Sequence, residues 1–307
     1  MNKKIAILIP CYNEELTIAK VINDFKKELP QSKIYVYDNN SNDNTAQIAK
    51  EAGALVKFVP DQGKGNVVRC MFMDIDADIY VMVDGDDTYP AKDVHKLIEP
   101  IVNNIADMSL GDRHSNGSYQ KQNDRNFHNF GNNLVATLIN TLYKRDLKDI
   151  MSGYRAFNRS FVKHFPVHSS GFEIETEMSM HALDKRFSIK EIEVDYIDRI
   201  EGSVSKLNTY SDGFKVLKTI FWLFKDYKPL TFFTYISGIF FLLSLISGLP
   251  VISEFIQTSY VTKIPSAILA VGLMLISFIS FFMGLLLDTI ARQHKDNFEL
   301  FRLRERH

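Results

Sequence analysis

Two long stretches without a charged residue, both near the C-terminus, constrain the architecture of this chain more than any other feature. No Asp, Glu, Lys or Arg occurs between Lys228 and Glu254, or between Lys263 and Asp288. Each stretch is longer than the roughly 20 apolar residues that a helix needs to cross the hydrocarbon core of a bilayer. We therefore expect two transmembrane helices, preceded by a separate folded domain. The alternative, two buried helices of a soluble helical domain, would need two such stretches side by side, which is unusual.

Basic residues flank the two stretches and predict their orientation in the membrane. They precede the first stretch and follow the second: Lys215, Lys218, Lys225, Lys228, Arg292, Lys295, Arg302, Arg304 and Arg306. The connecting loop carries only Glu254 and Lys263. By the positive-inside rule we expect both ends in the cytoplasm, in a multi-pass protein of the cell membrane. The expected order is a folded domain over residues 1–210, a juxtamembrane helix over 211–228, two transmembrane helices within 229–290, and a basic cytoplasmic tail over 291–307.

Residues 213–227 have the pattern of an amphipathic helix. One side of it is apolar, with Phe214, Leu217, Ile220, Phe221 and Phe224, and the lysines lie elsewhere. Such a helix suits the membrane interface, where its lysines would meet anionic headgroups. The alternative is a helix that packs on the folded domain. Further on, Pro250 is expected to mark the end of the first membrane span.

Short apolar runs alternate with helical patterns over residues 1–112. They predict strands at 5–9, 34–37, 55–59, 79–83 and 108–110, and helices at 14–29, 44–52, 66–73 and 94–102. Such alternation implies an α/β domain with a mainly parallel sheet covered by helices on both faces. Later segments predict loops at 115–126 and 198–208, a helix at 127–143, a tight segment at 150–158 and a strand at 189–197.

Polar residues gather where three of these strands end, at 10–14, 38–41 and 84–86. Ligands of such sheets bind beyond the carboxyl ends of the strands, so we expect the three segments to converge on one crevice. In an extended chain Asp84 and Asp86 would face the same side. Carboxylate oxygens suit Mg²⁺ or Mn²⁺, which bind one or two carboxylates together with substrate phosphates. The alternative is a polar turn whose acids face solvent.

Composition narrows the class of protein further. The chain has 36 basic and 37 acidic residues, so no basic field favours nucleic acid as a partner. Cys11 and Cys70 lack the spacing of a zinc site or a disulfide framework. The apolar run at 5–9 is too short for a secretion signal, so we expect the folded domain to stay in the cytoplasm.

Seven short segments combine into a specific pattern, although each is weak alone. They are 9–14 (Ile-Pro-Cys-Tyr-Asn-Glu), 38–45 (Asp-Asn-Asn-Ser-Asn-Asp-Asn-Thr), 63–66 (Gly-Lys-Gly-Asn), 84–86 (Asp-Gly-Asp), 111–113 (Gly-Asp-Arg), 152–155 (Ser-Gly-Tyr-Arg) and 202–207 (Gly-Ser-Val-Ser-Lys-Leu). Together they resemble the family 2 glycosyltransferases, which have the Rossmann-like GT-A fold, and among these the polyprenyl-phosphate glycosyltransferases of the dolichol-phosphate-mannose-synthase-like group. The resemblance covers roughly residues 4–210 and the two C-terminal spans that several members share.

The resemblance implies a binding site for a nucleotide-sugar donor. Its residues would be Pro10, Tyr12, Glu14, Asp38, Lys64, Asp84, Asp86, Arg199 and Lys206. Tyr12, Glu14 and Asp38 would hold the nucleoside. Asp38 would accept a hydrogen bond from the ring N–H of the base.

The resemblance also implies a metal ion and a clamp on the diphosphate. Asp84 and Asp86 would flank Mg²⁺ or Mn²⁺, with Asp86 as the direct ligand, and the ion would stabilise the leaving diphosphate. Arg199 and Lys206 would lie in the loop that closes over the diphosphate, where an arginine can make two contacts with phosphate. Thr88 stands where relatives commonly have Gln, so a third metal contact is not expected there.

For the acceptor, the resemblance implies that Arg113, Arg125 and Asn129 bind the phosphate of a polyprenyl lipid. Asn129 stands where relatives often have Ser, although its amide can still donate to phosphate. Asp149 matches a carboxylate that acts as a base or a positioning residue; the alternative is a helix-end cap. Glu173, Glu175 and Glu177 form a further acidic run, of which at most two can face the site. Glu177 is the preferred candidate, with a solvated face as the alternative.

The expected reaction is the inverting transfer of a sugar, glucose or an N-acetylhexosamine, from a UDP-sugar to undecaprenyl or another polyprenyl phosphate. Since a phosphate acceptor is already anionic, a strong general base is less necessary than for a hydroxyl. The alternatives are GDP-mannose as donor, or a membrane-anchored scaffold subunit with a degenerate site. A processive polysaccharide synthase is disfavoured because Trp222, the only tryptophan, is not in a Gln-x-x-Arg-Trp segment. Two spans make a small membrane domain, which favours a homo-oligomer.

Overall fold

The computed structural model describes residues 3–115, 126–200, 202 and 209–305, without the side chains at 126–134, 209–213, 215, 216 and 305. Most of the loops predicted at 115–126 and 198–208 therefore lie outside the described residues. The chain divides into two compact units, Met1–Ile220 and Phe221–His307. The boundary falls within a helix, some ten residues beyond the predicted end of the folded domain.

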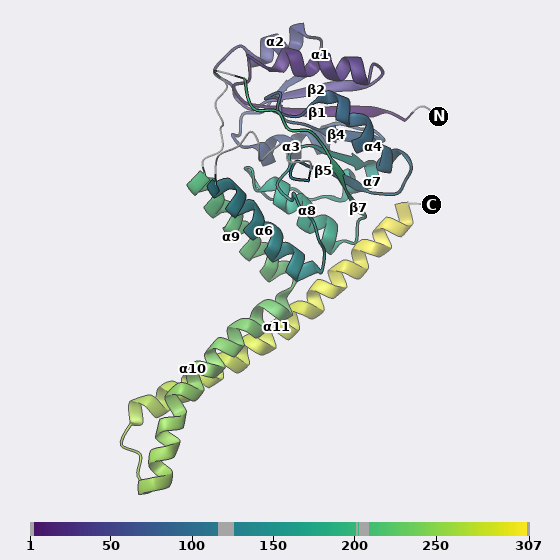
Figure 1. Ribbon diagram of the computed structural model, residues 1–307. Coiled ribbons are helices and arrows are strands. Elements are labelled where there is room, and N and C mark those ends of the chain that lie inside the picture. Colours follow the sequence, from purple (N-terminus) through teal and green to yellow (C-terminus); the bar gives the residue numbers. More distant parts are fainter. Residues whose placement is uncertain (1–2, 116–125, 201, 203–208, 306–307) are drawn as a thin grey trace. The chain divides into compact units, whose positions relative to one another are not determined.

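Within the described residues of the first unit, seven strands form one mixed, mainly parallel sheet (Figure 1). They are β1 (Ile5–Cys11), β2 (Lys33–Asp38), β3 (Leu55–Phe58), β4 (Ile79–Met82), β5 (Met108–Asp112), β6 (Arg155–Asn158) and β7 (Ile189–Glu193), in the order β3-β2-β1-β4-β6-β5-β7. β6 runs antiparallel to both of its neighbours, β4 and β5. The predicted α/β class is confirmed, whereas β6 falls in the segment that was expected to be only a tight turn.

The helices of this unit are α1 (Ile18–Glu28), α2 (Thr45–Glu51), α3 (Lys64–Asp74), α4 (Val94–Val102), α6 (Asn126–Tyr143), α7 (Arg159–His164), α8 (Ile174–Asp184) and α9 (Thr209–Tyr227), with a 3-10 turn η1 (Ala91–Asp93). α4 has the predicted bounds. α1 begins four residues later than predicted because the chain first makes a turn, in which Thr17 Oγ1 donates to the carbonyl of Gly85 at 2.6 Å. That bond ties the start of α1 to the segment after β4.

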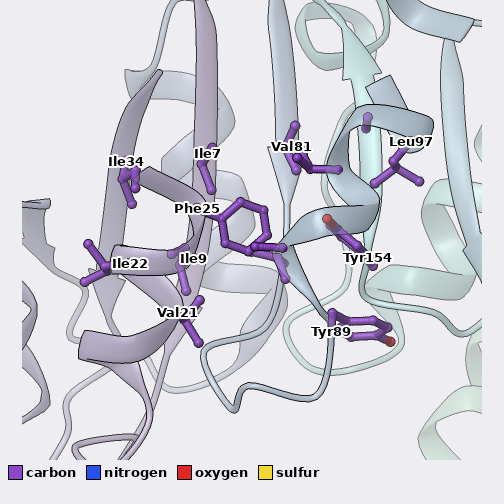
Figure 2. Packing of buried hydrophobic residues seen from close by; sticks show 14 of the residues in the cluster. Ile7, Ile9, Val21, Ile22, Phe25, Ile34, Val81, Tyr89, Leu97 and Tyr154 are labelled. Atoms are coloured by element: carbon purple, nitrogen blue, oxygen red, sulfur yellow. The ribbon is translucent and has the colours of Figure 1, made fainter. Parts of the chain in front are cut away.

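Helices cover both faces of the sheet. On one face, Val21, Ile22 and Phe25 of α1 pack with Ile7 and Ile9 of β1 in a buried cluster (Figure 2). On the other face, Phe72 of α3 makes edge contacts with aromatic rings of β4, β6 and the segment after α7: Tyr80, Phe157 and Phe165. Each such buried side chain contributes about 1.5–3 kcal/mol relative to an exposed one. This packing fixes the strand ends that carry the polar segments.

The sheet reverses its winding beside β1, which pairs in parallel with β2 on one side and with β4 on the other. The chain moves outward from β1 to β3 and then returns to β4, so the carboxyl end of β1 lies at a topological switch point, where ligands of such sheets bind. Cys11, the last residue of β1, is in register with Asp38 of β2, and Asn39 N donates to Cys11 O at 2.8 Å. A Cβ added at Gly85, in the segment after β4, would lie 2.6 Å from Cys11 Sγ, so the three segments that were predicted to converge do so.

The second unit contains two helices that are long and apolar enough to cross a membrane, α10 (Pro229–Thr258) and α11 (Ile264–Glu305). In their most apolar windows only 11% and 17% of the residues are buried inside the protein, which does not fit core helices of a soluble domain. Pro250, which was predicted to mark the end of the first span, lies inside α10, and the helix continues to Thr258. A helix tolerates an interior proline by bending around the missing hydrogen bond. Residues 291–305 continue α11.

Small and hydroxylic residues join α10 to α11. Ser237 Oγ lies 3.0 Å from Ser277 Oγ, and Ser244 Oγ donates to Ala270 O at 2.8 Å. At Gly284 the helices approach so closely that an added Cβ would lie 2.8 Å from Phe233 Cβ. Close packing at small residues and interhelical hydrogen bonds are the main attractions between helices in a bilayer.

Leucine at Gly284 is therefore expected to weaken the helix pair by about 1–3 kcal/mol, the usual cost of overpacking. Gly272 of the same helix is the matched control, because nothing lies within 4 Å of a Cβ added there. Thermal unfolding in detergent, followed by circular dichroism, should show a lower melting temperature for Gly284→Leu than for Gly272→Leu. Equal melting temperatures would mean that the close approach at Gly284 does not hold the helices together.

Candidate active site

Asp84 and Asp86 follow β4, which ends at Met82, and Asp86 lies in a turn that begins at Gly85. Strand alternation therefore does not place the two carboxylates. They are nevertheless close enough to interact: burial, followed by the negative charge of Asp84, raises the pKa of Asp86 above its ordinary value. Thr88 Oγ1 donates to Asp86 Oδ1 at 2.7 Å, so it supports this carboxylate.

Each of these aspartates has a cation of the chain beside it. Lys64 Nζ lies 2.5 Å from Asp84 Oδ1, and Arg199 forms an ion pair with Asp86. Lys64 is buried, which by itself lowers its pKa, but the charges of Asp84 and Glu175 hold the pKa above its usual value. Lys64 is therefore a charged group at neutral pH.

The glycines around Lys64 explain how it reaches this position. Lys64 is the first residue of α3, and Gly63 before it has φ +129°, a conformation that favours glycine. A Cβ at Gly63 or Gly65 would overlap the carbonyl oxygens of Ser170 and Ser169, respectively. The Gly-Lys-Gly sequence thus lets the start of α3 lie against this backbone, with Lys64 directed to the strand ends.

At the end of β2, Asp38 is buried and incompletely satisfied. Its Oδ2 accepts from Ser41 N at 3.3 Å, whereas its Oδ1 is buried without a hydrogen-bond partner among the described residues. A buried carboxylate oxygen in this state is costly unless a donor completes it. Of the neighbouring residues predicted for the same ligand, Pro10 lies in β1 and Tyr12 follows it, both half-buried, and Glu14 is buried.

Asp149 makes a two-point ion pair with Arg113. Arg113 Nε and Nη2 donate to Asp149 Oδ2 and Oδ1 at 2.7 and 2.8 Å, and the carboxylate is fully buried. Burial alone would raise the pKa of Asp149, but the guanidinium of Arg113 holds it below its usual range. This bidentate geometry makes Asp149 an ionised carboxylate that fixes the guanidinium, which differs from a helix-end cap.

A fully buried arginine organises the loop that carries Asp149. Arg155 of β6 donates from Nε to Ser152 O at 2.8 Å, from Nη2 to Ile150 O at 2.5 Å and from Nη1 to Ser179 Oγ at 3.0 Å. Burial lowers the pKa of Arg155 to about 10, so it still carries its charge near neutral pH. The same loop also reaches Asp84, since a Cβ at Gly153 would overlap Asp84 Oδ2. It therefore brings Asp149 and Asp84 into one site.

Glu175, which the sequence left without a role, is the glutamate that reaches the site. Glu175 lies on the first turn of α8, and its Oε1 is 2.6 Å from Lys64 Nζ. Glu177, the preferred candidate, instead accepts from the backbone N–H groups of His168 and Ser169 at 3.0 and 2.8 Å. Which glutamate faces Lys64 depends on where α8 begins, at Ile174. Three glutamates at every second position do not reveal that start, so the sequence could not select Glu175.

Three predicted residues cannot be placed in the site. Arg125 and Lys206 lie outside the described residues, and Asn129 lies in α6 with its side chain outside them. Their assignments stay predictions from the sequence.

The donor set suits a divalent ion that shares its ligands with a substrate. Among the described residues no group of three or more His, Cys, Asp or Glu is arranged to hold a metal by itself. Asp84 and Asp86 offer two carboxylates, and Mg²⁺ in proteins commonly takes one or two carboxylates and completes its shell with phosphate oxygens and water. Burial and the like charge of Asp84 raise the pKa of Asp86, and a cation bound between the two carboxylates would relieve that repulsion.

The raised pKa of Asp86 has a testable consequence for stability. Because the folded-state pKa lies above the unfolded one, the stability that this group contributes is present at low pH and is lost as pH rises through the folded pKa. Without metal, Asp86→Asn is therefore expected to melt a few degrees above the wild type at neutral pH, with the gain disappearing in acid. Asp87→Asn, which loses an ion pair with Lys20, should show no gain. Melting curves across pH check this, and a gain that persists in acid would contradict it.

Residues 6–165 match the model of Glycosyl transferase family 2. The chain is 60% identical over 113 residues to Protein RfbJ of Shigella flexneri, covering 37% of this chain and 88% of that protein. It is 34% identical to Glycosyltransferase AglJ of Haloferax volcanii, covering 75% of each chain. It is 29% identical to Dolichyl-phosphate beta-glucosyltransferase of Saccharomyces cerevisiae, covering 70% of this chain and 72% of that protein.

A solved structure shares the fold. Glucosyl-3-phosphoglycerate synthase from Mycobacterium tuberculosis, in complex with Mn²⁺, UDP and glucosyl-3-phosphoglycerate, superimposes with a TM-score of 0.60. The alignment has 20% sequence identity and covers 72% of this chain and 80% of that one. The likeness agrees with the predicted GT-A fold class.

Proposed function

This chain belongs to glycosyl transferase family 2, and from that premise we propose that it transfers a sugar from a nucleotide sugar to a polyprenyl phosphate at a membrane surface. One observation carries the proposal: carboxylates and cations from far apart in the sequence meet at the switch point of the sheet. Tyr89 connects the residues around Asp84 with those around Arg113 and Asp149. Gly153 N donates to the Tyr89 hydroxyl at 3.2 Å, and the charges of Asp84, Arg113 and Asp149 are all near enough to affect the pKa of that hydroxyl.

The donor half is proposed to bind the nucleoside at the ends of β1 and β2. The buried Oδ1 of Asp38, which has no hydrogen-bond partner within the part of the chain that the structure describes, can accept from the ring N–H of a base. Pro10, Tyr12 and Glu14 lie on the neighbouring segment. UDP is the favoured nucleotide, with glucose or an N-acetylhexosamine as its sugar. The fold neighbour in complex with UDP and Mn²⁺ supports a UDP-sugar in a site of this topology.

Asp84 and Asp86 are proposed to hold Mg²⁺ or Mn²⁺ together with the donor diphosphate. When bound, the ion would stabilise the negative charge that develops on the leaving nucleoside diphosphate. Lys64 and Arg199 are charged donors at the same place, suited to phosphate oxygens, and Lys206 is proposed to join them.

The acceptor half is proposed to centre on Arg113, with Arg125 and Asn129. The lipid phosphate oxygen would attack the anomeric carbon, form the new C–O bond with inversion, and break the bond to the diphosphate. This nucleophile needs no proton removed, which agrees with Asp149 being ionised and engaged with Arg113. We therefore assign Asp149 to positioning rather than to proton transfer. The name of the yeast relative, Dolichyl-phosphate beta-glucosyltransferase, supports a lipid-phosphate acceptor.

The membrane is proposed to bring the lipid to the site. On α9 several large apolar side chains are exposed: Phe214, Leu217, Phe221 and Trp222. These exposed side chains support the predicted interfacial helix over 211–228. Two spans within 229–290 and cytoplasmic residues 291–307 are proposed to follow it. At 30 residues α10 is about 45 Å long, more than a hydrocarbon core of about 30 Å requires. Both ends are proposed to be cytoplasmic, in the cell membrane, and self-association stays a prediction.

A donor-by-acceptor screen tests this function. Detergent-purified protein is incubated with labelled UDP-sugars or GDP-mannose, Mg²⁺ or Mn²⁺, and undecaprenyl phosphate, and the organic extract is counted. Label is expected in the lipid from a UDP-sugar, and UDP should raise the melting temperature more than GDP does. Stronger stabilisation by GDP, with label from GDP-mannose, would favour the mannosyltransferase alternative. No labelled lipid and no stabilisation by any nucleotide would favour the scaffold alternative.

A further inference from the structure

Each aspartate proposed to bind metal shares its cation with a second carboxylate. Lys64 Nζ lies 2.5 Å from Asp84 Oδ1 and 2.6 Å from Glu175 Oε1. In the same way, Arg199 pairs with Asp86 and has its Nη1 3.7 Å from Glu14 Oε1. The site therefore contains two triads of one cation and two carboxylates, Asp84–Lys64–Glu175 and Asp86–Arg199–Glu14.

Each cation occupies one oxygen of a carboxylate that a divalent ion would need: Lys64 lies on Asp84 Oδ1, and Arg199 lies on Asp86 Oδ2. Lys64, Glu14, Glu175 and Asp86 are almost fully buried, so repulsion between a cation of the chain and a metal ion would be weakly screened. A metal ion on Asp84 and Asp86 therefore competes with Lys64 and Arg199 for these carboxylates.

The residues that carry the second carboxylates are held in place, which gives the displaced cations a partner on which to remain. Glu175 stands on the first turn of α8 beside the buried charge of Arg155. Glu14 is held through its backbone, because its N–H donates to Thr45 Oγ1 at 2.8 Å and its carbonyl accepts from Thr17 N and Ile18 N. A cation that leaves Asp84 or Asp86 can remain on its glutamate, at the edge of the metal site.

We propose that Glu175 and Glu14 are positioning residues, which retain Lys64 and Arg199 when the metal takes Asp84 and Asp86 and so present both cations to the donor diphosphate. The inference rests on the proposed function. It makes metal and nucleotide mutually dependent: the metal alone must displace two cations, whereas a diphosphate offers these cations new partners. Reciprocal coupling between two ligands of this kind is typically 5–150-fold.

The substitution Glu175→Gln distinguishes the retention of Lys64 by Glu175 from simple repulsion between Glu175 and an anionic ligand. Removing a negative charge near a diphosphate site should by itself tighten the binding of UDP, which is an anion. If Glu175 retains Lys64, the substitution should instead weaken UDP binding at saturating Mn²⁺, by about tenfold, within the range of such couplings. Calorimetry measures this affinity. Glu173→Gln is the matched control: Glu173 is also buried but accepts from Gly171 N, and it should not weaken UDP binding.

A second variant tests the competition directly and without nucleotide. Arg199→Gln is expected to bind Mn²⁺ alone about tenfold more tightly than the wild type, measured by the loss of the free-ion signal in electron paramagnetic resonance. Lys20→Gln, which frees Asp87 instead, should leave Mn²⁺ affinity unchanged. Unchanged Mn²⁺ affinity in Arg199→Gln, or tighter UDP binding in Glu175→Gln, would overturn the inference. Lipid product from the wild type would still support the proposed function in that case, so the two failures can be told apart.

Discussion

Asparagine at position 86 is expected to lower the rate of sugar transfer about 10³-fold, which is the scale of losing a preorganised electrostatic contact in a transition state. The substitution keeps the size of Asp86 but removes the charge that, together with Asp84, would hold the metal ion. The hydrogen bonds from Thr88 can persist to the amide oxygen, so the turn after β4 should stay intact. Since this variant is also expected to melt above the wild type at neutral pH, a loss of rate could not come from unfolding.

Asp87→Asn is the matched control, because Asp87 is the next residue and pairs with Lys20 of α1 instead of a site cation. It has φ +60°, a conformation that asparagine also tolerates. Initial rates of labelled-lipid formation, at saturating Mn²⁺ and donor, compare the two variants. If Asp87→Asn loses as much activity as Asp86→Asn, the metal carboxylates have been misassigned.

Asparagine at position 149 is expected to lower kcat/KM for the lipid phosphate about 10²-fold, the scale of misplacing a catalytic contact by about 1 Å. One carboxylate oxygen becomes an amide donor that faces the guanidinium of Arg113, so the two-point pair breaks and Arg113 loses its fixed position. The KM for the nucleotide sugar should change little. Asp146→Asn is the control, since Asp146 lies on the same loop and is exposed.

A double-mutant cycle separates positioning from proton transfer at Asp149. If Asp149 acts through Arg113, the variant Arg113→Gln/Asp149→Asn should be no slower than Arg113→Gln alone, because coupled residues are not additive. An independent base would make the two losses multiply. The pH profile gives a second criterion: the pKa of Asp149 is lowered, so its ionised form, and the stability it contributes, are lost only as pH falls through that lowered value. A limb of the wild-type rate profile above pH 5 that disappears in Asp149→Asn would contradict the positioning role.

The parts of this fold that sequence could predict are those with a strong local pattern. Val94, Leu97, Ile98 and Ile101 repeat at helical spacing and are all buried, which is why α4 has the predicted bounds. Short apolar runs bounded by polar residues likewise predicted strands at 5–9, 34–37 and 79–83, and the observed strands end within two residues of these bounds, at Cys11, Asp38 and Met82. Local periodicity is the most dependable information that a single sequence carries.

The parts that sequence could not predict depend on long-range partners. β6 begins with Arg155, a residue that argues against a buried strand until the carbonyls of Ile150 and Ser152 accept its donors. Glu175 meets Lys64 across 111 positions, and no local rule selects it over Glu177. The triads of Glu14 and Glu175 likewise exist only because the segments after β1, β4 and β7 meet the starts of α3 and α8.

The most direct measurement of the central claim is the transfer of labelled sugar to undecaprenyl phosphate with and without a divalent ion. With the best donor of the screen, the wild type is expected to form labelled lipid in Mn²⁺ or Mg²⁺, to lose this activity in a chelator and to recover it when the ion is restored. Asp86→Asn should form almost none under any of these conditions. Labelled lipid that forms equally well in the chelator, or equally well with Asp86→Asn, would contradict the account.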